Sequence, residues 1–484
     1  MLFRSDAAAR AAGTAGSAVL FAGLTVVIAL LGLLVIDVGF VTTMAVAAAA
    51  TVALAVLVSL TALPALLGIV GERIVRGRAR HPGTHRPEGH GAGPAHRWAR
   101  AVTSRPWLAV LAVVGVLGLA ALPAQDLRLG MPSGAASPAG TAERVNDDLT
   151  AQALGEGANG SLLVTVQRAD ADEPDPDRMA ATVDELAALP GVANASLRGT
   201  NEDRTLEIYQ VTPQTGPTDA ATEELVQRLR DPGAISTADQ LGVTGLTAVN
   251  IDLSERLAEA VPVYLGLVAG LSLVVLLLVL RSVVIPLAAT AGFLLTVAAT
   301  FGLTTAVFGT ATLGWLADVD RPGVVLSFLP VMATGILYGL AMDYQVFLGS
   351  SMRESRAHGA DGTEAVVDGF VHAGRVVVAV AVIMVSVFGV FILGDDPMVK
   401  QFGFALAAGI LVDAFLVRMT FMPAVMQLAG RAAWWLPRWL DRILPVLDIE
   451  GSRLERPRGG SPRRARRAAQ LRPVEEPAVG EGRS

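Results

Sequence analysis

Three ionisable side chains lie inside long apolar segments of this sequence. Asp343 lies in GILYGLAMDYQVFLG, and Asp413 and Arg418 lie in GILVDAFLVRMTF. A charged residue at the centre of a membrane helix costs roughly 2.5–3.5 kcal/mol on insertion scales. One guanidinium compensates one carboxylate, which leaves the second acid able to take up a proton. Unequal numbers of acids and bases at such a depth are typical of proton pathways.

Asp343 shares a helix face with two glycines. Gly335, Gly339 and Asp343 recur at four-residue spacing, which aligns them along one side of an α-helix. Small residues at this spacing allow a neighbouring helix to approach closely. We therefore expect Asp343 to face a helix interface rather than lipid. Tyr344 lies about 100° further round the helix, and we expect it to reach a neighbouring polar group.

Asp413 and Arg418 are five residues apart, which separates them by about 140° on an α-helix. This spacing predicts that they are poorly placed to pair only with each other, so that Arg418 is available to Asp343. Counted at about 1.5 Å per residue from the nearest boundary charges, all three lie in one layer of the membrane. The alternative is a static ion pair that sets the helix register, since buried pairs commonly bring no net stability.

Apolar runs long enough to cross a bilayer occur eight times in the 484 residues, of which 52% are hydrophobic. They cover about residues 17–36, 43–67, 106–124, 261–280, 286–308, 325–349, 376–394 and 402–427. The composition therefore predicts an α-helical polytopic membrane protein with about eight transmembrane helices. Arginines are concentrated after the second run and in the tail, so the positive-inside rule predicts that both termini are cytoplasmic. The expected location is the cell membrane.

A soluble, acidic segment lies between the third and fourth apolar runs. Residues 125–259 contain 23 acids and 9 arginines, and we expect this segment on the extracytoplasmic side. Its pattern predicts the order strand, helix, strand, strand, helix, strand, which is one split βαβ sandwich. GVTGLTAVNID is expected to form the final strand. The helix that follows is expected to continue without a break into the fourth run, which would couple the domain mechanically to the membrane.

Seven regions and an internal repeat follow from these patterns. We expect two transmembrane helices in 1–70, a cytoplasmic Arg/Pro/Gly-rich linker in 71–105, a transmembrane helix in 106–124, a porter-like α+β domain in 125–260, a five-helix bundle in 261–430, an interfacial Trp-rich helix in 431–450 and a disordered basic tail in 451–484. The second and eighth runs align on Pro64 and Pro423. This match predicts that the chain is half of a duplicated protein followed by a complete second half.

Catalytic and metal chemistry have little support in the sequence. His81, His85, His90 and His96 are irregularly spaced in a Gly/Pro-rich stretch, so we expect no metal site and no cofactor. The sequence contains no Walker motif, no zinc signature and no Ser/His/Asp set. We therefore expect a protein that is not an enzyme, and its acidic soluble segment does not suit nucleic acid.

The charged segments closely resemble actinobacterial MMPL-type (mycobacterial membrane protein large) transporters of the resistance–nodulation–division (RND) superfamily. The resemblance rests on LSFLPVMATGILYGLAMDYQVFLGSSMRES, on GDDPMVKQFGFALAAGILVDAFLVRMTFMPAVM and on RAAWWLPRWLDRILP. It implies export of lipids or other hydrophobic molecules driven by the proton-motive force. It also implies twelve membrane helices, two porter domains and two Asp-Tyr pairs that form the relay. Asp343 and Tyr344 match the pair of the tenth helix, and Asp413 and Arg418 match charged positions of the twelfth.

The resemblance also implies that the first four helices, the first porter domain and the first Asp-Tyr pair lie outside this chain. The leading hypothesis is therefore a lipid or drug exporter that is incomplete or needs a second polypeptide to supply those helices. Its partners would be a hydrophobic substrate, protons and the membrane. Two alternatives remain: a non-transporting scaffold or degenerate remnant, and a lipid- or sterol-binding module without proton coupling.

Overall fold

The computed structural model describes residues 16, 19–79, 94–167, 176–202, 205–236, 240–342 and 362–444. The chain groups into two compact units. One holds residues 1–24, 53–84 and 445–484, and the other holds residues 25–52 and 85–444. In the first unit, Gly16 faces Leu60 and Gly23 faces Val56, so small residues allow two apolar helices to pack closely. The site residues discussed below belong to the second unit.

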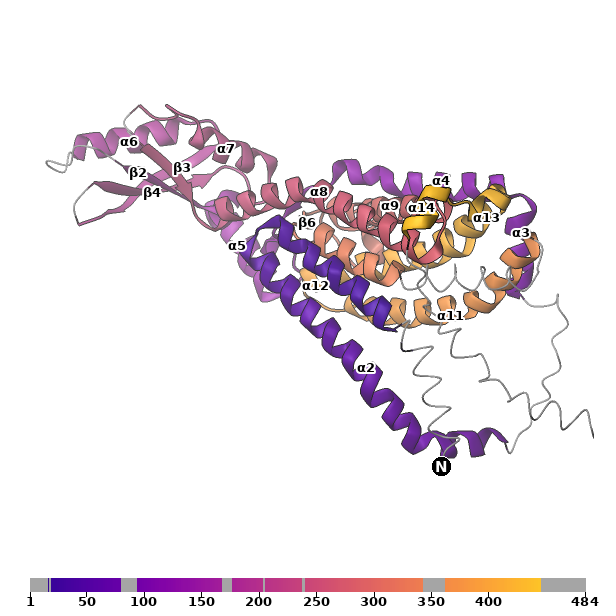
Figure 1. Ribbon diagram of the computed structural model, residues 1–484. Coiled ribbons are helices and arrows are strands. Elements are labelled where there is room, and N and C mark those ends of the chain that lie inside the picture. Colours follow the sequence, from indigo (N-terminus) through magenta and orange to yellow (C-terminus); the bar gives the residue numbers. More distant parts are fainter. Residues whose placement is uncertain are drawn as a thin grey trace, which may run out of the picture. The chain divides into compact units, whose positions relative to one another are not determined.

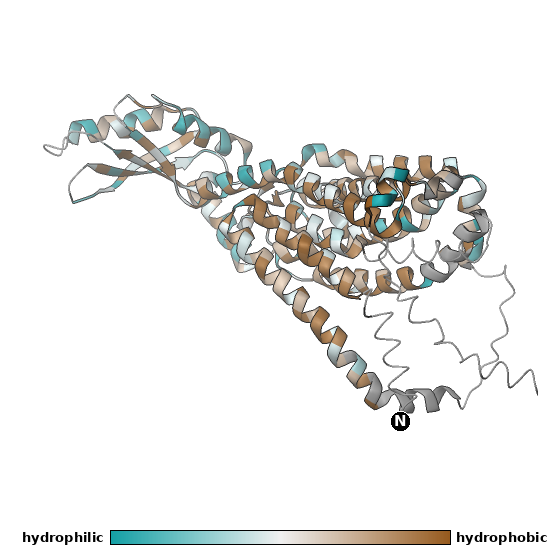
Figure 2. Ribbon diagram, viewed as in Figure 1, coloured by the Kyte–Doolittle hydropathy of each residue, from teal (hydrophilic) through white to brown (hydrophobic). Residues whose placement is uncertain are grey.

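Seven helices in the described residues are long and apolar enough to cross a membrane, and they match seven of the eight predicted runs. They are Val19–Ile36, Gly39–Leu66, Pro106–Asp126, Leu246–Leu280, Val284–Gly309, Gly374–Phe391 and Pro397–Ala429. The remaining predicted run, 325–349, is described as the helix Leu329–Met342, and its later residues lie outside the described chain. Hydrophobic residues dominate these helices (Figure 2). The fold is that of an α-helical polytopic membrane protein.

The helices of the second unit have the following bounds in Figure 1: α3 Pro94–Ser104, α4 Pro106–Ala121, α5 Ala142–Leu154, α6 Pro176–Ala188, α7 Ala220–Arg230, α8 Leu246–Leu280, α9 Val284–Thr304, α11 Gly362–Phe391, α12 Pro397–Leu411, α13 Met422–Ala429 and α14 Arg438–Ile443, while α2 Gly39–Ala79 extends into the first unit. Two spans lie at the centre of the bundle. In the most apolar stretch of each span, 61% of the residues are buried in Val284–Gly309 and 67% in Pro397–Ala429. These spans can therefore hold polar groups away from lipid.

The soluble α+β domain is a four-stranded antiparallel sheet with helices packed on one face. Its strands are β2 Leu162–Gln167, β3 Val192–Thr200, β4 Leu206–Pro213 and β5 Gln240–Thr244. They lie in the order β3-β4-β2-β5, so β4 separates the parallel pair β2 and β3, as the split βαβ prediction requires. Alternate residues of β2 and β4 are buried. They form the core with Leu186 of α6 and Leu225 of α7, because strand side chains alternate between faces.

Helix α8 connects the α+β domain to the bundle as one continuous element of 35 residues (Figure 1). This confirms the predicted unbroken helix. The final strand was predicted too long, however, since β5 ends at Thr244 and α8 already begins at Leu246. Gly245 between them has φ +106°, a conformation that ends the strand and favours glycine. The next residues then follow helical spacing, with Ala248 and Ile251 packed against the sheet core.

A second, very short sheet pairs the residues just after the span Pro106–Asp126 with the residues just before the helix Leu329–Met342. Strand β1, Leu129–Gly130, pairs in parallel with β6, Val325–Leu326. The side chain of Gln401 on α12 flanks β6: its Oε1 accepts from the Leu326 N–H at 2.8 Å, and its Nε2 donates to the Val324 carbonyl at 3.2 Å. The helix Leu329–Met342 begins three residues after β6. Two-residue strands leave no periodicity to detect, so the sequence analysis missed this sheet.

The described part of the Trp-rich segment after the last span contains less helix than predicted. A 3₁₀ turn covers Gly430–Trp434, and α14 covers only Arg438–Ile443. Trp435 and Trp439 are 58% and 65% exposed, which is the exposure expected of interfacial aromatic anchors. Residues 80–93 of the predicted linker and the tail from 445 lie outside the described residues.

Candidate transport site

Asp413 and Arg418 form a buried ion pair inside the bundle. The Arg418 Nε donates to the Asp413 Oδ2 at 2.5 Å, and the residues are 4% and 8% exposed for Arg418 and Asp413 respectively. Their spacing was predicted to place them poorly for pairing only with each other; they do pair, and the availability of Arg418 to Asp343 stays a prediction. Residues Val412–Phe421 form a π-helix, in which hydrogen bonds join positions five apart. Positions i and i+5 therefore lie on one side, and the 140° separation of an α-helix does not apply.

Arg418 also contacts the helix that leads to Asp343. Its Nη2 donates to the backbone carbonyl of Ala341, two residues before Asp343 in the chain. The guanidinium thus joins the π-helix to the end of the helix Leu329–Met342. Asp343 and Tyr344 themselves lie outside the described residues, so their place beside this pair stays a prediction.

Gly335 and Gly339 lie where two helices approach the helix Leu329–Met342. A Cβ on Gly335 would stand 2.5 Å from the hydroxyl of Tyr264 on α8. A Cβ on Gly339 would stand 2.6 Å from the Val26 Cγ2 of the first span. Both distances are too short for a real contact, so a larger residue at either position would force the neighbouring side chain to move.

Tyr264 ties these helices together and was missed by the sequence analysis. It is 1% exposed, and its hydroxyl donates to the Ala29 carbonyl at 3.0 Å. A buried tyrosine hydroxyl needs such a partner, so this bond stabilises the junction of α8 with the first span. The signal that could have identified it in the sequence is a single tyrosine within an apolar run.

Further polar groups gather near the end of the helix that leads to Asp343. The Thr290 hydroxyl donates to the Ser272 Oγ at 3.3 Å, and that hydroxyl in turn lies 3.7 Å from the Met342 sulfur. Tyr338 is 1% exposed and packs edge-on against Phe293 at 5.7 Å between ring centroids. Within the described residues its hydroxyl has no hydrogen-bond partner. A polar setting therefore surrounds the position before Asp343.

A threonine column on α9 is satisfied within its own helix. Thr296, Thr300 and Thr304 are buried, and each hydroxyl donates to the carbonyl four residues earlier, at 3.1, 2.7 and 2.7 Å. Such bonds are the usual way for threonine to be accommodated in an apolar helix. We therefore assign this column a packing role, and the ionisable pair remains the chemically distinctive feature.

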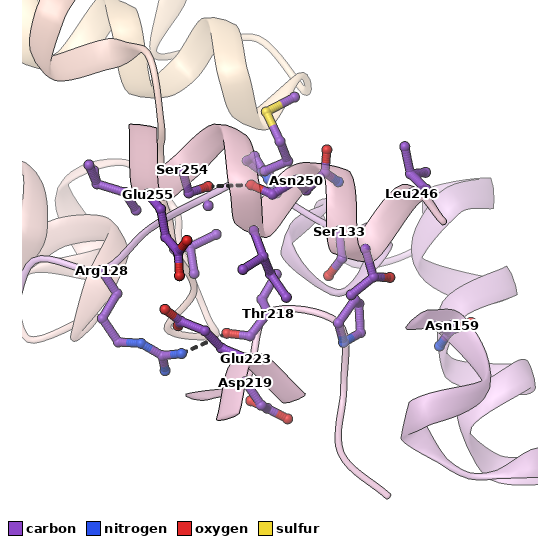
Figure 3. A pocket seen from close by; sticks show the side chains of 18 of the residues that line it. Arg128, Ser133, Asn159, Thr218, Asp219, Glu223, Leu246, Asn250, Ser254 and Glu255 are labelled. Atoms are coloured by element: carbon purple, nitrogen blue, oxygen red, sulfur yellow. Dashed lines mark hydrogen bonds between the residues drawn. The ribbon is translucent and has the colours of Figure 1, made fainter. Parts of the chain in front are cut away.

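A cavity of about 870 Å³ lies where the α+β domain meets the membrane helices (Figure 3). Its polar wall comes from soluble segments and includes Asn159, Asp219 and Glu223. Its apolar wall includes Val261 of α8 and Phe301 of α9. The volume falls within the range of small-molecule sites. Its lining comes from segments far apart in the chain, which is why no sequence motif revealed it.

The ionisable groups of this cavity are mainly acidic. Burial raises the pKa of the Asp147 carboxyl above its ordinary value, and the neighbouring Asp148 adds to the effect. Asp148 lies just outside the cavity, and the hydrogen bond from Arg321, 3.0 Å long, lowers its pKa. The cavity guanidinium, Arg128, donates to the Thr218 carbonyl at 2.8 Å. The chain can therefore offer negative charge to a ligand there.

Several proteins of known sequence are similar to the chain over most of its length. The chain is 40% identical over 451 residues to membrane protein YdfJ of Bacillus subtilis (strain 168), a match that covers 93% of this chain and 61% of that protein. It is 31% identical over 455 residues to the mycolic acid-containing lipids exporter MmpL11 of Mycolicibacterium smegmatis, covering 92% and 47%. It is also 31% identical over 451 residues to the heme uptake protein MmpL11 of Mycobacterium tuberculosis (strain H37Rv), covering 92% and 46%.

The chain thus spans about half to three fifths of the length of these relatives. Their names describe membrane and transport proteins, which places the chain with transporters rather than enzymes. The model of the MMPL family matches residues 3–109 and 147–447, a range that includes the ion pair and most of the cavity. The chain belongs to the MMPL family.

Proposed function

We propose that this chain is part of an exporter of lipids or other bulky amphiphiles, drugs included, driven by the proton-motive force. The observation that carries the proposal is the buried Arg418, which pairs with Asp413 and also binds the backbone two residues before Asp343. In a membrane bundle of this family, such a group of acids and one base suits proton transfer.

In this mechanism Asp343 is the acid that takes up and releases the proton, with Tyr344 beside it. The Arg418 Nε binds Asp413 at 2.5 Å. The guanidinium charge therefore compensates the negative charge of Asp343 only in part, and Asp343 stays able to take up a proton. One proton that crosses a potential of 100 mV supplies about 2.3 kcal/mol. Protonation of Asp343 would change the electrostatic attraction between Arg418 and the end of the helix Leu329–Met342.

Contacts at the other end of that helix would carry the movement to the cavity. The helix follows β6, which pairs with β1 in the cavity wall. The Ser327 hydroxyl, next to β6, lies 2.7 Å from the Ser254 hydroxyl of α8, and Ser254 also lines the cavity. A shift of one helix therefore reaches both walls of the cavity through direct contacts.

The substrate class follows from the cavity and from the relatives. One relative is named for mycolic acid-containing lipids and another for heme, and both cargoes are bulky and carry polar groups on a large apolar body. We propose the same general class for this chain. We also propose that both termini are cytoplasmic, that the α+β domain lies outside, and that a second polypeptide or a longer form of this protein supplies the partner helices.

A lipid- or sterol-binding module without proton coupling is the second candidate function. The cavity of about 870 Å³ favours it, because a preformed amphipathic cavity can bind lipid with no relay. A non-transporting scaffold would need neither the cavity nor the ion pair. Dependence of transport on the proton gradient identifies the exporter, and lipid binding without transport distinguishes the module from the scaffold.

The test uses vesicles from the native host, so that any partner is present. Efflux of a fluorescent lipid is measured with and without an uncoupler, for wild type, Asp343→Asn and Asp395→Asn. Asp395 is an exposed acid outside the bundle core, so its substitution serves as the control. We expect Asp343→Asn to lower the uncoupler-sensitive rate of efflux at least tenfold. Equal uncoupler-sensitive rates in all three would overturn the relay, and lipid binding without any such efflux would favour the module.

A further inference from the structure

We propose that the cavity between the α+β domain and the membrane helices selects a cationic amphiphile, with an amine or quaternary ammonium head in its acidic part and the apolar tail against the membrane helices. The inference rests on the proposed function in taking the cavity as the cargo site. It adds the sign of the charge on the head group of the cargo and the orientation of the cargo in the cavity.

The acidic part of the cavity has a large excess of negative charge. Among the described lining residues, five carboxylates accompany one guanidinium: Glu143, Asp147, Asp219, Glu223 and Glu255, with Arg128. A concave site lined by charges of one sign, with apolar walls, focuses its potential and attracts counter-ions. An anionic head would meet repulsion from most of this surface, whereas a cationic head would be attracted.

Two of these carboxylates accept hydrogen bonds from neutral donors, and the guanidinium of Arg230, which acts on Glu255 from outside the lining, is paired with Asp252 at 2.5 Å. The Glu255 Oε1 accepts from the Gln227 amide at 2.6 Å, and the Asp219 Oδ2 accepts from the Gly216 N–H at 2.8 Å. Both donors are neutral, so they orient the carboxylates without cancelling their charge. Arg128 directs its Nη2 to a backbone carbonyl, that of Thr218.

The distribution of the carboxylates fits an organic cation better than a metal ion. Four of them come from three helices, with Glu143 and Asp147 on α5, Glu223 on α7 and Glu255 on α8, and Asp219 directly precedes α7. Figure 3 shows Glu223 and Glu255 extending into the same part of the cavity. In the part of the chain that the structure describes, no three acids or histidines are grouped closely enough to hold a metal. A dispersed charge in about 870 Å³ suits a large, weakly hydrated head.

The apolar part of the cavity fixes the direction of the tail. Ala258 and Val261 of α8, Phe301 of α9 and Pro330 line it, and all four belong to helices of the bundle. Apolar atoms therefore continue from the membrane side, and an amphiphile gains most when its tail lies there.

The experiment measures binding of two matched probes to the purified full chain in zwitterionic lipid nanodiscs, with no proton gradient. Both probes have the same dansyl-labelled dodecyl chain, with a trimethylammonium head in one and a sulfonate head in the other. We expect wild type to bind the cation at least tenfold more tightly. The double variant Glu223→Gln/Glu255→Gln should reduce the ratio of the two affinities to below threefold, chiefly because it binds the cationic probe more weakly.

Glu224→Gln is the matched control, since Glu224 neighbours Glu223 on α7 but lies outside the cavity lining and pairs with Arg228 at 3.6 Å. It should keep the wild-type ratio. Thermal unfolding of each variant, together with an affinity for the sulfonate probe that is no lower than that of wild type, shows that the double variant is folded. Equal affinity of wild type for both probes, or an equal loss with Glu224→Gln, would overturn the proposal. Because no gradient is used, that result would leave proton-driven export untouched, and loss of efflux alone would leave the binding preference intact.

Discussion

Gln401 acts as a third strand for Leu326: its side-chain amide supplies the acceptor and the donor that a neighbouring backbone would supply on that side of β6. Gln401 is 3% exposed and Leu326 is fully buried, so water cannot replace these bonds. Strand β6 is therefore held between β1 and α12 immediately before the helix that leads to Asp343.

Replacement of Gln401 by methionine should loosen this attachment. The change keeps the length of the side chain but leaves the Leu326 N–H and the Val324 carbonyl unsatisfied, which costs about 1–3 kcal/mol for each buried group. We expect a clear fall in the midpoint of thermal unfolding in detergent and a weaker link between cargo binding and proton flux. An unchanged midpoint with unchanged coupling would contradict the role assigned to Gln401.

Removal of one member of the ion pair should be more harmful than removal of both. Asp413→Asn or Arg418→Gln alone leaves an uncompensated buried charge or an unmet donor, at a cost of about 3–5 kcal/mol. The double variant removes both charges and should recover part of that loss. Denaturant unfolding of the four proteins gives the coupling energy directly. Additive losses would mean that the 2.5 Å contact is not an energetic pair.

Alanine at Gly335 should separate α8 from the helix Leu329–Met342. The new Cβ would lie 2.5 Å from the Tyr264 hydroxyl, so that side chain must move and its bond to Ala29 must break. We expect a loss of about 1–3 kcal/mol for this overpacking. Gly270→Ala is the control, because a Cβ there has no atom within 4 Å. Equal unfolding midpoints for the two variants would show that the close approach at Gly335 has no energetic weight.

Two adjacent aspartates should respond to pH in opposite directions. The pKa of Asp147 is raised, chiefly by burial, so its ionisation weakens the fold as pH rises from about 3.9, the unfolded value, through the folded pKa. Asp147→Asn should therefore be more stable than wild type at pH 7, with the difference gone below both pKa values. Unfolding curves between pH 3 and pH 7 measure it.

The pKa of Asp148 is lowered, chiefly by the hydrogen bond from Arg321. Its ionised form stabilises the fold above the unfolded pKa, and this contribution is lost as pH falls through the folded pKa. Asp148→Asn should thus be less stable than wild type at pH 7, and the two should converge in acid. Shifts of the same sign for Asp147→Asn and Asp148→Asn at pH 7 would contradict the assigned environments.

Elements with strong periodicity were predictable from the sequence. Alternation identified β2 and β4, and the long apolar pattern identified α8 as one helix from the soluble domain into the bundle. Each of these signals depends on a regular repeat of about two or 3.6 residues. The boundary at Gly245 was misplaced because an apolar run such as LTAV fits both a strand and a helix.

The geometry of the site was harder to predict for the same reason. The pairing of Asp413 with Arg418 depends on π-helical winding, which a 3.6-residue repeat cannot reveal. The cavity combines Arg128, Glu223 and Phe301 from distant segments, and β1 pairs with β6 across nearly 200 residues. Such features arise from tertiary packing and have no local pattern.

The unbroken length of α8 gives the molecule a lever arm. At about 1.5 Å per residue its 35 residues extend about 50 Å, whereas the hydrocarbon core of a bilayer is about 30 Å thick. About 20 Å of the helix therefore exceeds the thickness of the lipid, and the part ahead of Pro262 carries Asn250, Ser254 and Glu255 of the cavity wall. A tilt of about 10° within the membrane would swing the end of that projection by about 3–4 Å, enough to change the width of the cavity by roughly the diameter of a methyl group.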